Sequence, residues 1–279
     1  MSVWGMARSS YYAARRREQR PSVPAKRGPR RPSDEELVNE IHQVIAESVF
    51  HGEGYRKIWA RLRHKGVRVW KERVLRLMRE NQLLSPSRQL TIEPGNPHEG
   101  SIIPEKPNQL WGTDATATFT QQEGQVTIFA AIDHCSADCI GIHVVKKAHR
   151  FEALEPIRQA VREQFGSFSA GVAAGVRLRH DHGSVYMSDD FQNELRFIGM
   201  ESSPAFVRQP EGNGCIERFF RTLKEQLLWV RSFRDLGELR DALVAFQHRY
   251  NKHWILGRLR YRTPAQARLD FSLALDQAA

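Results

Sequence analysis

The chain has no long apolar run and few cysteines. No segment of its 279 residues approaches the roughly 18 consecutive apolar residues of a membrane-spanning helix. The first residues contain no apolar stretch typical of secretory signals, so neither a membrane protein nor a secreted one is expected. The three cysteines, Cys135, Cys139 and Cys215, are odd in number and lack CxxC spacing. This pattern argues against a zinc ribbon and suits a reducing cytoplasm.

What the chain does have is enough apolar sequence for a core and a surplus of positive charge. Apolar residues make up 41% of the sequence, and the length suits about two domains with connectors. The formal net charge is +10, and residues 1–31 contain eight arginines and Lys26 against one acid, Glu18. Such an arm gains affinity for a polyanion by releasing counterions. Contact with nucleic acid is therefore favoured over a solubilising tail.

The region after this arm predicts three short helices. Ser33-Asp-Glu-Glu36 has the form of a capping box, and a helical apolar face follows it to about Val49. Further helices are predicted over 55–65 and 71–80, and their arrangement is typical of a helix-turn-helix unit. The outer face of the last helix would carry four basic residues, Lys71, Arg73, Arg76 and Arg79. These could contact DNA phosphates or base edges, and a solvated basic face is the simpler alternative.

After a proline-rich linker the pattern changes to an α/β one. Three strands, a helix, a strand, a short helix, a short strand and further helices follow in order, which describes an RNase H-like core. The predicted strands are 110–116, 125–133, 139–145, 175–180 and 201–203. The predicted helices are 151–165, interrupted near its start by Pro156, then 189–197, one from near Glu217 through Leu228, and 236–250.

These elements predict an α/β protein whose RNase H-like, retroviral integrase-like catalytic core is preceded by a small all-α helix-turn-helix-like domain. The expected organisation runs from a flexible basic arm at 1–32 to a helix-turn-helix-like domain at 33–84, a linker at 85–107, the core at 108–232, and a C-terminal helix and tail at 233–279.

Three acidic residues occupy positions that such a core could bring together. Asp114 lies on the first strand, Asp181 follows the fourth, and Glu217 begins a later helix, with thirty-five residues between Asp181 and Glu217. Two divalent cations held by carboxylates can activate a water or a 3′-hydroxyl for in-line attack on a phosphodiester. Mg²⁺ prefers such oxygens and keeps several waters. The set predicts a two-Mg²⁺ site in which Mn²⁺ substitutes, although each acid alone would also suit a turn, a strand end or a helix N-terminus.

Several neighbours of these acids have two interpretations. Asp133 could be a fourth ligand, but a strand-end acid near the site is favoured. His180 and His182 are expected to be hydrogen-bonded or exposed and not metal ligands. Three basic residues follow Glu217, and at least one is expected to contact a phosphate: Arg218, Arg221 and Lys224, the last lying two helical turns after Glu217. The aromatic residues expected in the core, and not stacked on bases, are Trp59, Trp111 and Phe220.

As an ordered set, the motifs resemble those of bacterial insertion-sequence transposases of the OrfB type, in the group numbered three, whose core is similar to retroviral integrases. The resemblance covers roughly residues 35–268. The matching segments are Tyr55-Arg-Lys-Ile-Trp-Ala-Arg-Leu62, Arg73-Val-Leu-Arg-Leu-Met-Arg-Glu80, Trp111-Gly-Thr-Asp114, His180-Asp-His-Gly-Ser-Val-Tyr186, Gly212-Asn-Gly-Cys-Ile-Glu-Arg218 with Thr222-Leu-Lys224, and Tyr250-Asn251 with Thr263-Pro264.

The resemblance implies that Asp114, Asp181 and Glu217 are the DDE metal ligands and that Lys224 lies beside the DNA. It implies cleavage at an element end, then attack by the freed 3′-hydroxyl on another phosphodiester, with no covalent protein–DNA intermediate. The implied partners are the terminal inverted repeats, target DNA, further copies of the chain and an upstream OrfA protein, often joined by frameshifting, in a bacterial cytoplasm. Residues 4–12 look like a helix-turn-helix fragment entered part-way, which fits such a fusion.

The sequence departs from the family pattern at two places. Gly212 stands where an Asp often precedes the Asn, and His180 and His182 flank Asp181 where Ser and Arg are common. Neither departure affects a predicted ligand, so both bear on subgroup and local DNA contacts. Two alternatives stay open: a catalytically inactive or domesticated DNA-binding relative, and a stand-alone RNase H-like nuclease. The intact triad favours the transposase.

Overall fold

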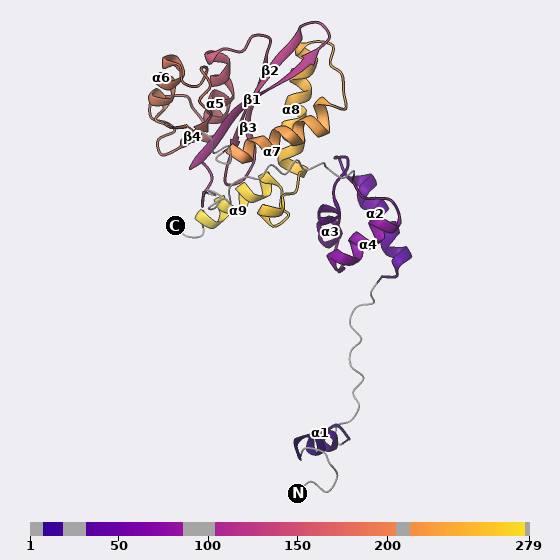
Figure 1. Cartoon of the computed structure of the whole chain (residues 1–279). Coiled ribbons are helices and arrows are strands. Elements are labelled where there is room, and N and C mark those ends of the chain that lie inside the picture. The colour runs from indigo at the N-terminus through magenta and orange to yellow at the C-terminus, as the bar shows by residue number, and fades with distance from the viewer. Residues whose placement is uncertain (1–7, 19–31, 86–103, 205–212, 277–279) are drawn as a thin grey trace.

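A computed structural model describes residues 8–18, 32–85, 104–204 and 213–276, and Figure 1 shows a three-helix unit beside an α/β core. Within the predicted basic arm, α1 spans Arg8–Glu18. The three-helix unit consists of α2 (Asp34–Glu47), α3 (Tyr55–His64) and α4 (Lys71–Glu80). No helix in the described ranges has the length and apolar character needed to cross a membrane.

The three-helix unit forms for the local reasons that its sequence indicates. The predicted capping box is present, because the Ser33 hydroxyl accepts the Glu36 N–H (3.1 Å) and the Glu36 carboxylate accepts the Ser33 N–H (2.7 Å). The apolar face of each helix turns inward. Its buried residues are Leu37, Ile41, Val44, Ile58, Leu62, Val74, Leu77 and Met78. The unit therefore has a core of its own.

The core is built on a five-stranded sheet of order β3-β2-β1-β4-β5. β1 (Leu110–Thr120), β2 (Gly124–Asp133) and β3 (Cys139–Val145) form the predicted antiparallel meander. β4 (Arg177–His180) and β5 (Glu201–Pro204) then add in parallel on the other side of β1. This mixed sheet confirms the predicted RNase H-like fold class.

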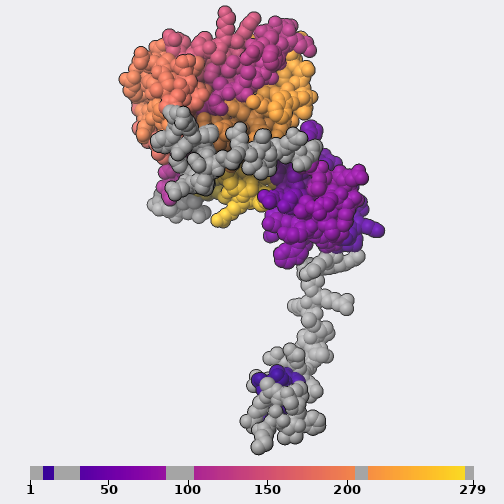
Figure 2. Space-filling model, viewed as in Figure 1, coloured from indigo at the N-terminus to yellow at the C-terminus, as the bar shows by residue number. Residues whose placement is uncertain are grey.

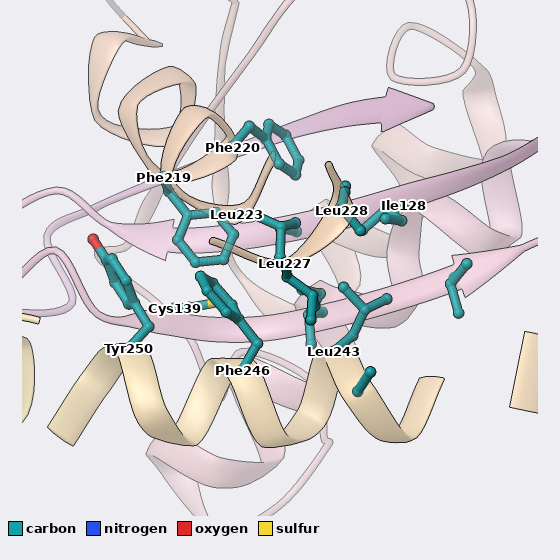
Figure 3. Close-up of a cluster of buried hydrophobic side chains, with 14 of the residues drawn as sticks. Ile128, Cys139, Phe219, Phe220, Leu223, Leu227, Leu228, Leu243, Phe246 and Tyr250 are labelled. Atoms are coloured by element: carbon teal, nitrogen blue, oxygen red, sulfur yellow. The ribbon is translucent and has the colours of Figure 1, made fainter. Parts of the chain in front are cut away.

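Helices cover both faces of the sheet because its central strands are apolar on both faces. One face carries α5 (Arg150–Phe165) and α6 (Asp189–Ile198), and the other carries α7 (Gly214–Leu223) and α8 (Leu236–His253). Figure 3 shows how the second layer closes: aromatic side chains of α7 and α8 point toward one another beside the strands. The shortest of these ring contacts joins Phe219 and Tyr250 at 5.0 Å.

Two details of the predicted helices are wrong. Pro156 does not interrupt α5, which runs through it without a break. Packing against the sheet holds this helix. Pro156 is buried, and its backbone approaches β3 so closely that a Cβ on Gly141 would lie only 2.0 Å from the Pro156 carbonyl oxygen. The Glu217 helix does not continue regularly through Leu228, because η2 (Lys224–Leu228) is π-helical. A π-helical turn holds one more residue than an α-helical one and is frequent at functional sites.

The C-terminal region contains more structure than was predicted. After α8 come a short 3₁₀ helix, η3 (Gly257–Leu259), and a further helix, α9 (Pro264–Asp276). The sequence did not predict α9. Two of its residues hold it against the core: Ala267, which is fully buried, and Arg268, which pairs with buried acids of the core.

Candidate active site

The sheet and α7 place the three predicted acids at one site. Asp114 is half-buried on β1 opposite Ala130 of β2. In the parallel pairing of β1 with β4, Gly112 lies opposite Arg179, so two residues further along both strands come Asp114 and Asp181. Glu217 lies in the first turn of α7, and the side chains of Asp181 and Glu217 are exposed.

The acids influence one another electrostatically. Burial, together with the charges of Asp181 and Glu217, raises the pKa of Asp114 to about 6, against the lowering effects of the Ala115 N–H that it accepts at 2.8 Å and of the charge of Lys224. Burial of the inner side of Glu217 also raises its pKa, while the neighbouring Arg218 lowers it. The charges of Asp181, Glu217 and Lys224, which lie on three separate segments, therefore all act on Asp114.

The chemistry of this donor set suits divalent cations. Within the described ranges, no three acidic, histidine or cysteine side chains lie close enough together to hold one metal ion. The three carboxylates therefore share an electrostatic site without forming a closed ligand cluster. Carboxylate oxygens are the ligands that Mg²⁺ prefers.

An anchor next to the acids joins α7 to β1. Asn213, which precedes α7, is buried, and its side-chain amide donates to the Thr113 carbonyl oxygen (3.1 Å), the residue before Asp114. A Cβ on Gly112 would lie 2.5 Å from His134 Nε2 and 2.7 Å from Asn213 Oδ1. Only glycine therefore leaves room for His134 and Asn213 above β1. The motifs Trp111-Gly-Thr-Asp114 and Asn213-Gly-Cys-Ile-Glu217 meet at this point.

Sequence reasoning did not assign a role to Tyr186, which was quoted only within a motif. The structure buries it beneath the site, where burial, Asp114 and Asp181 together hold its pKa far above the usual range. Its hydroxyl oxygen has no hydrogen-bond partner in the described part of the chain. His180 stacks on its ring at 5.6 Å. Tyr186 thus lies close enough to Asp114 and Asp181 for their charges to act on its hydroxyl.

His180 is hydrogen-bonded, in agreement with the favoured interpretation. It is fully buried, with Nδ1 2.7 Å from the Asp181 carbonyl oxygen and Nε2 2.8 Å from the Ser202 hydroxyl. Both ring nitrogens are thus engaged, and burial lowers the pKa of the imidazole. His180 fixes the chain just before Asp181, and His182 is exposed.

Asp133 is occupied by structural bonds. Its side chain is fully buried, and it accepts the N–H groups of Cys135 (2.8 Å), Ser136 (3.0 Å) and Asn108 (2.7 Å). Arg268 adds a charge at 3.3 Å. These bonds support the view that Asp133 is a strand-end residue near the site.

The predicted DNA-contacting residues fall into two groups. Lys224, Arg218 and Arg221 all lie near the acids, since the charge of Lys224 acts on Asp114 and those of both arginines act on Glu217. On α4, by contrast, Arg73 pairs with Asp34 (2.5 Å), and Arg76 pairs with Asp34 (2.7 Å) and Glu80 (2.9 Å). Lys71 is exposed beside the Trp59 ring (5.7 Å).

The aromatic residues expected in the core are packed against protein. Trp111 is fully buried and stacks on Phe165 at 6.0 Å. Phe220 is buried, and Trp59 is partly buried against the core of the three-helix unit. The prediction that these three are core residues is confirmed.

Comparisons with known proteins match both parts of the chain. Residues 32–89 match the model of an HTH-like domain, and residues 104–210 and 199–264 each match an integrase core domain. Transposase InsD for insertion element IS2A/D/F/H/I/K of Escherichia coli is 27% identical over 244 residues, which are 85% of this chain and 79% of InsD. Transposase InsD for insertion element IS2-9 of Escherichia coli strain K12 is also 27% identical, over 85% of this chain and 78% of its own.

The chain therefore contains an HTH-like domain followed by an integrase core domain, and it is similar to transposases of insertion elements. This confirms the resemblance to OrfB-type transposases and makes the protein a polynucleotidyl transferase. The transposase also shares its fold with a chain in the cryo-electron microscopy structure of the simian T-cell lymphotropic virus intasome in complex with PP2A regulatory subunit B56 gamma. That match has a TM-score of 0.50 and 18% identity, and it covers 85% of this chain and 74% of the other.

Proposed function

We propose that this transposase cuts DNA at the ends of an insertion element and joins the freed 3′-hydroxyl to target DNA, using Asp114, Asp181 and Glu217 as its catalytic residues. One observation carries the proposal: two acids from separate elements lie close enough to a third, half-buried acid on the central strand for their charges to act on it. None of the three is in an ion pair with another described residue. Carboxylates left in this state are available to ligands of opposite charge.

The three carboxylates would hold two Mg²⁺ ions, for which Mn²⁺ would substitute. Asp114 is the best placed to be shared, because the charges of both other acids act on it. Asp181 and Glu217 would each complete one of the two sites. When bound, such ions supply activation of the attacking hydroxyl and stabilise the leaving oxygen. The protein needs no nucleophilic side chain, so no covalent protein–DNA intermediate is expected.

The chain's own basic residues would hold the DNA. The charge of Lys224 acts on Asp114, and the charges of Arg218 and Arg221 act on Glu217. A phosphate that enters the site would therefore lie near all three cations. Lys71 would contact DNA from α4. Arg73 and Arg76 would have to exchange Asp34 for a phosphate, so we expect them to contribute less.

The expected partners are the element's terminal inverted repeats, target DNA and further copies of the chain, in a bacterial cytoplasm. An OrfA protein, separate or fused by frameshifting, would supply recognition of the terminal repeats. The HTH-like match of residues 32–89 and the transposase relatives support DNA as the substrate.

The test replaces Glu217 with Gln, which keeps the size of the side chain and removes its charge. On duplexes carrying the ends of the encoding element, with OrfA present, we expect Mn²⁺-dependent nicking and strand transfer to fall about 10³-fold, while DNA affinity changes less than about twofold. Glu201→Gln is the matched control, because Glu201 is exposed on β5. Equal inactivity of wild type and E217Q would contradict catalysis, and hydrolysis without strand transfer would indicate a nuclease instead.

A further inference from the structure

The three-helix unit is joined to the catalytic core by the loop between α2 and α3. Figure 2 shows the unit lying against the core, on the side of the C-terminal segments. Phe50, from this loop, is buried within the core cluster of α7 and α8, with its ring 4.8 Å from Trp254 and 6.4 Å from Phe246. An aromatic side chain of the DNA-binding unit is therefore part of the catalytic core.

Polar contacts surround the buried Phe50 side chain. The buried carboxylate of Glu53 accepts bonds from Arg61 (2.5 and 3.0 Å) and from the Ser48 hydroxyl (2.9 Å). Arg61 in turn donates to the His253 carbonyl oxygen at the end of α8 (3.2 Å). Glu53 thus holds the loop and the Arg61 side chain in the conformation that reaches the core.

One residue of the core closes the contact from the other side. The side-chain amide of Gln226 accepts the His51 N–H (2.9 Å) and donates to the His51 carbonyl oxygen (2.8 Å). Both hydrogen-bonding groups of a single loop residue are therefore satisfied by one glutamine. Such a pair fixes both distance and direction, because each bond has its own preferred geometry.

Gln226 lies on η2, two residues after Lys224 and on the segment that continues from the helix of Glu217. A single continuous segment therefore runs from the proposed catalytic acid, through the proposed phosphate-contacting lysine, to the contact with the DNA-binding unit. The wider π-helical turn changes the direction of the side chains after Leu223 relative to a regular helix.

We propose that Gln226 and Phe50 are positioning residues that set the distance between the DNA-binding unit and the active site, and so select the phosphodiester that is cut. The inference rests on the proposed function. DNA held by the three-helix unit would be presented to Asp114, Asp181 and Glu217 at a fixed offset. Without the contacts of Phe50 and Gln226, the three-helix unit would remain folded on its own core but would no longer be held in one orientation relative to the catalytic core.

The test compares Gln226→Ala with Gln247→Ala in the full chain. Gln247 is the matched control, since its amide also donates to a backbone carbonyl, that of Cys139 (2.8 Å), but within the catalytic core. End-labelled duplexes carrying the ends of the encoding element are cut in Mn²⁺, and the cut positions are mapped. We expect one dominant position for wild type and Q247A, and cuts spread over neighbouring phosphodiesters with about tenfold less of the main product for Q226A.

Two further measurements keep the outcomes separate. Gln226→Glu keeps the acceptor for the His51 N–H and loses the donor, so an intermediate spread is expected. Small-angle X-ray scattering without DNA should give a larger radius of gyration for Q226A and for Phe50→Ala than for wild type and Q247A. Cutting by Q226A at one unshifted position overturns the positioning role. An unchanged radius of gyration overturns the claim that Gln226 and Phe50 hold the three-helix unit against the core. If wild type cuts no DNA, the proposed function and the selection of a phosphodiester both fail, while the scattering still tests whether these residues hold the unit.

Discussion

Two groups of acidic residues lie near each other in the core, but their contacts within the protein differ. Asp114 of one group and Asp133 of the other are about three residue steps, or roughly 10 Å, apart along the β1–β2 ladder. One is the triad of Asp114, Asp181 and Glu217. The other, here called the buried acid cluster, consists of Asp133 and Asp138 with Arg268. Both place negative charge beside strand ends in a basic protein, so composition alone does not distinguish them.

The acids of the buried acid cluster are hydrogen-bonded and ion-paired within the protein, although burial still raises the pKa of Asp138. Arg268 of α9 contacts Asp138 at 2.8 and 3.1 Å and Asp133 at 3.3 Å, and it also donates to Gln164 (2.6 Å). The Ser136 hydroxyl bonds to both acids. In the triad, Asp114 and Asp181 each accept an N–H group from a nearby residue of the chain, Ala115 and Gly183.

The difference separates acids that hold the fold together from acids that, in the proposed function, would bind metal ions. A buried carboxylate that is fully bonded to N–H groups and a guanidinium stabilises one conformation. A half-buried carboxylate with two acidic neighbours carries an electrostatic cost, which a bound cation or protonation relieves. This is why Asp133 is assigned to the structure, whereas Asp114 is proposed to take part in the chemistry, although both stand on the central strands.

The largest predicted effect on stability breaks the buried acid cluster. Arg268→Met removes the cation and leaves Asp133 and Asp138 buried, so we expect a loss of about 3 kcal/mol in the free energy of unfolding. Urea titration measures it. The control is Arg262→Met, whose pair with Asp270 is exposed and should contribute less than about 1 kcal/mol. Equal losses for the two variants would mean that the cluster is no more structural than a surface pair.

A smaller effect is expected at Gly112, which lies between the two acidic groups. Gly112→Ala would drive a methyl group into His134 and Asn213, at a cost of about 1–3 kcal/mol. Because Asn213 anchors α7 beside Asp114, nicking per folded molecule should also fall. Gly237→Ala, whose Cβ would approach only the Asp235 side chain (3.2 Å), is the control and should leave nicking unchanged. A fully active G112A would show that Asn213 does not position Glu217.

The smallest predicted effect depends on pH and has the opposite sign. Since the pKa of Asp114 is raised to about 6 in the folded chain, its carboxylate destabilises the metal-free protein above that pH. Asp114→Asn should therefore add about 1–2 kcal/mol at pH 7, less than the full shift implies because the side chain is half-exposed. The gain should shrink as the pH falls through 6 and vanish near 4.

Thermal unfolding in EDTA at pH 7, 6, 5 and 4 checks this, with Asp241→Asn, an exposed residue of α8, as the control. A constant gain at all four pH values would mean that the Asp114 charge is not the cause. In saturating Mn²⁺ the order should reverse, because wild type would gain the stabilisation of a bound ligand.

Local sequence signals predicted much of this molecule. The capping box at Ser33, the limits of α4 and β3, and the order of strands follow from hydrogen bonds and apolar periodicities within a few residues. The acidic triad is predicted from short motifs that occur in a fixed order along the chain, and its catalytic role stays a prediction. The role of Gly112 could have been suspected from its place before Asp114, but its reason is the close approach of His134 and Asn213, which are distant in the sequence.

What the sequence by itself determined is therefore most of the elements of the core and the three acids that lie on them or directly after them. Tertiary structure alone decided that α9 exists as part of the core, that Arg268 neutralises Asp133 and Asp138 and not the triad, and that Gln226 joins η2 to the DNA-binding unit. The physical reason is that periodicity reports which face of an element is buried. It carries no information on which distant side chain completes a hydrogen bond or an ion pair there.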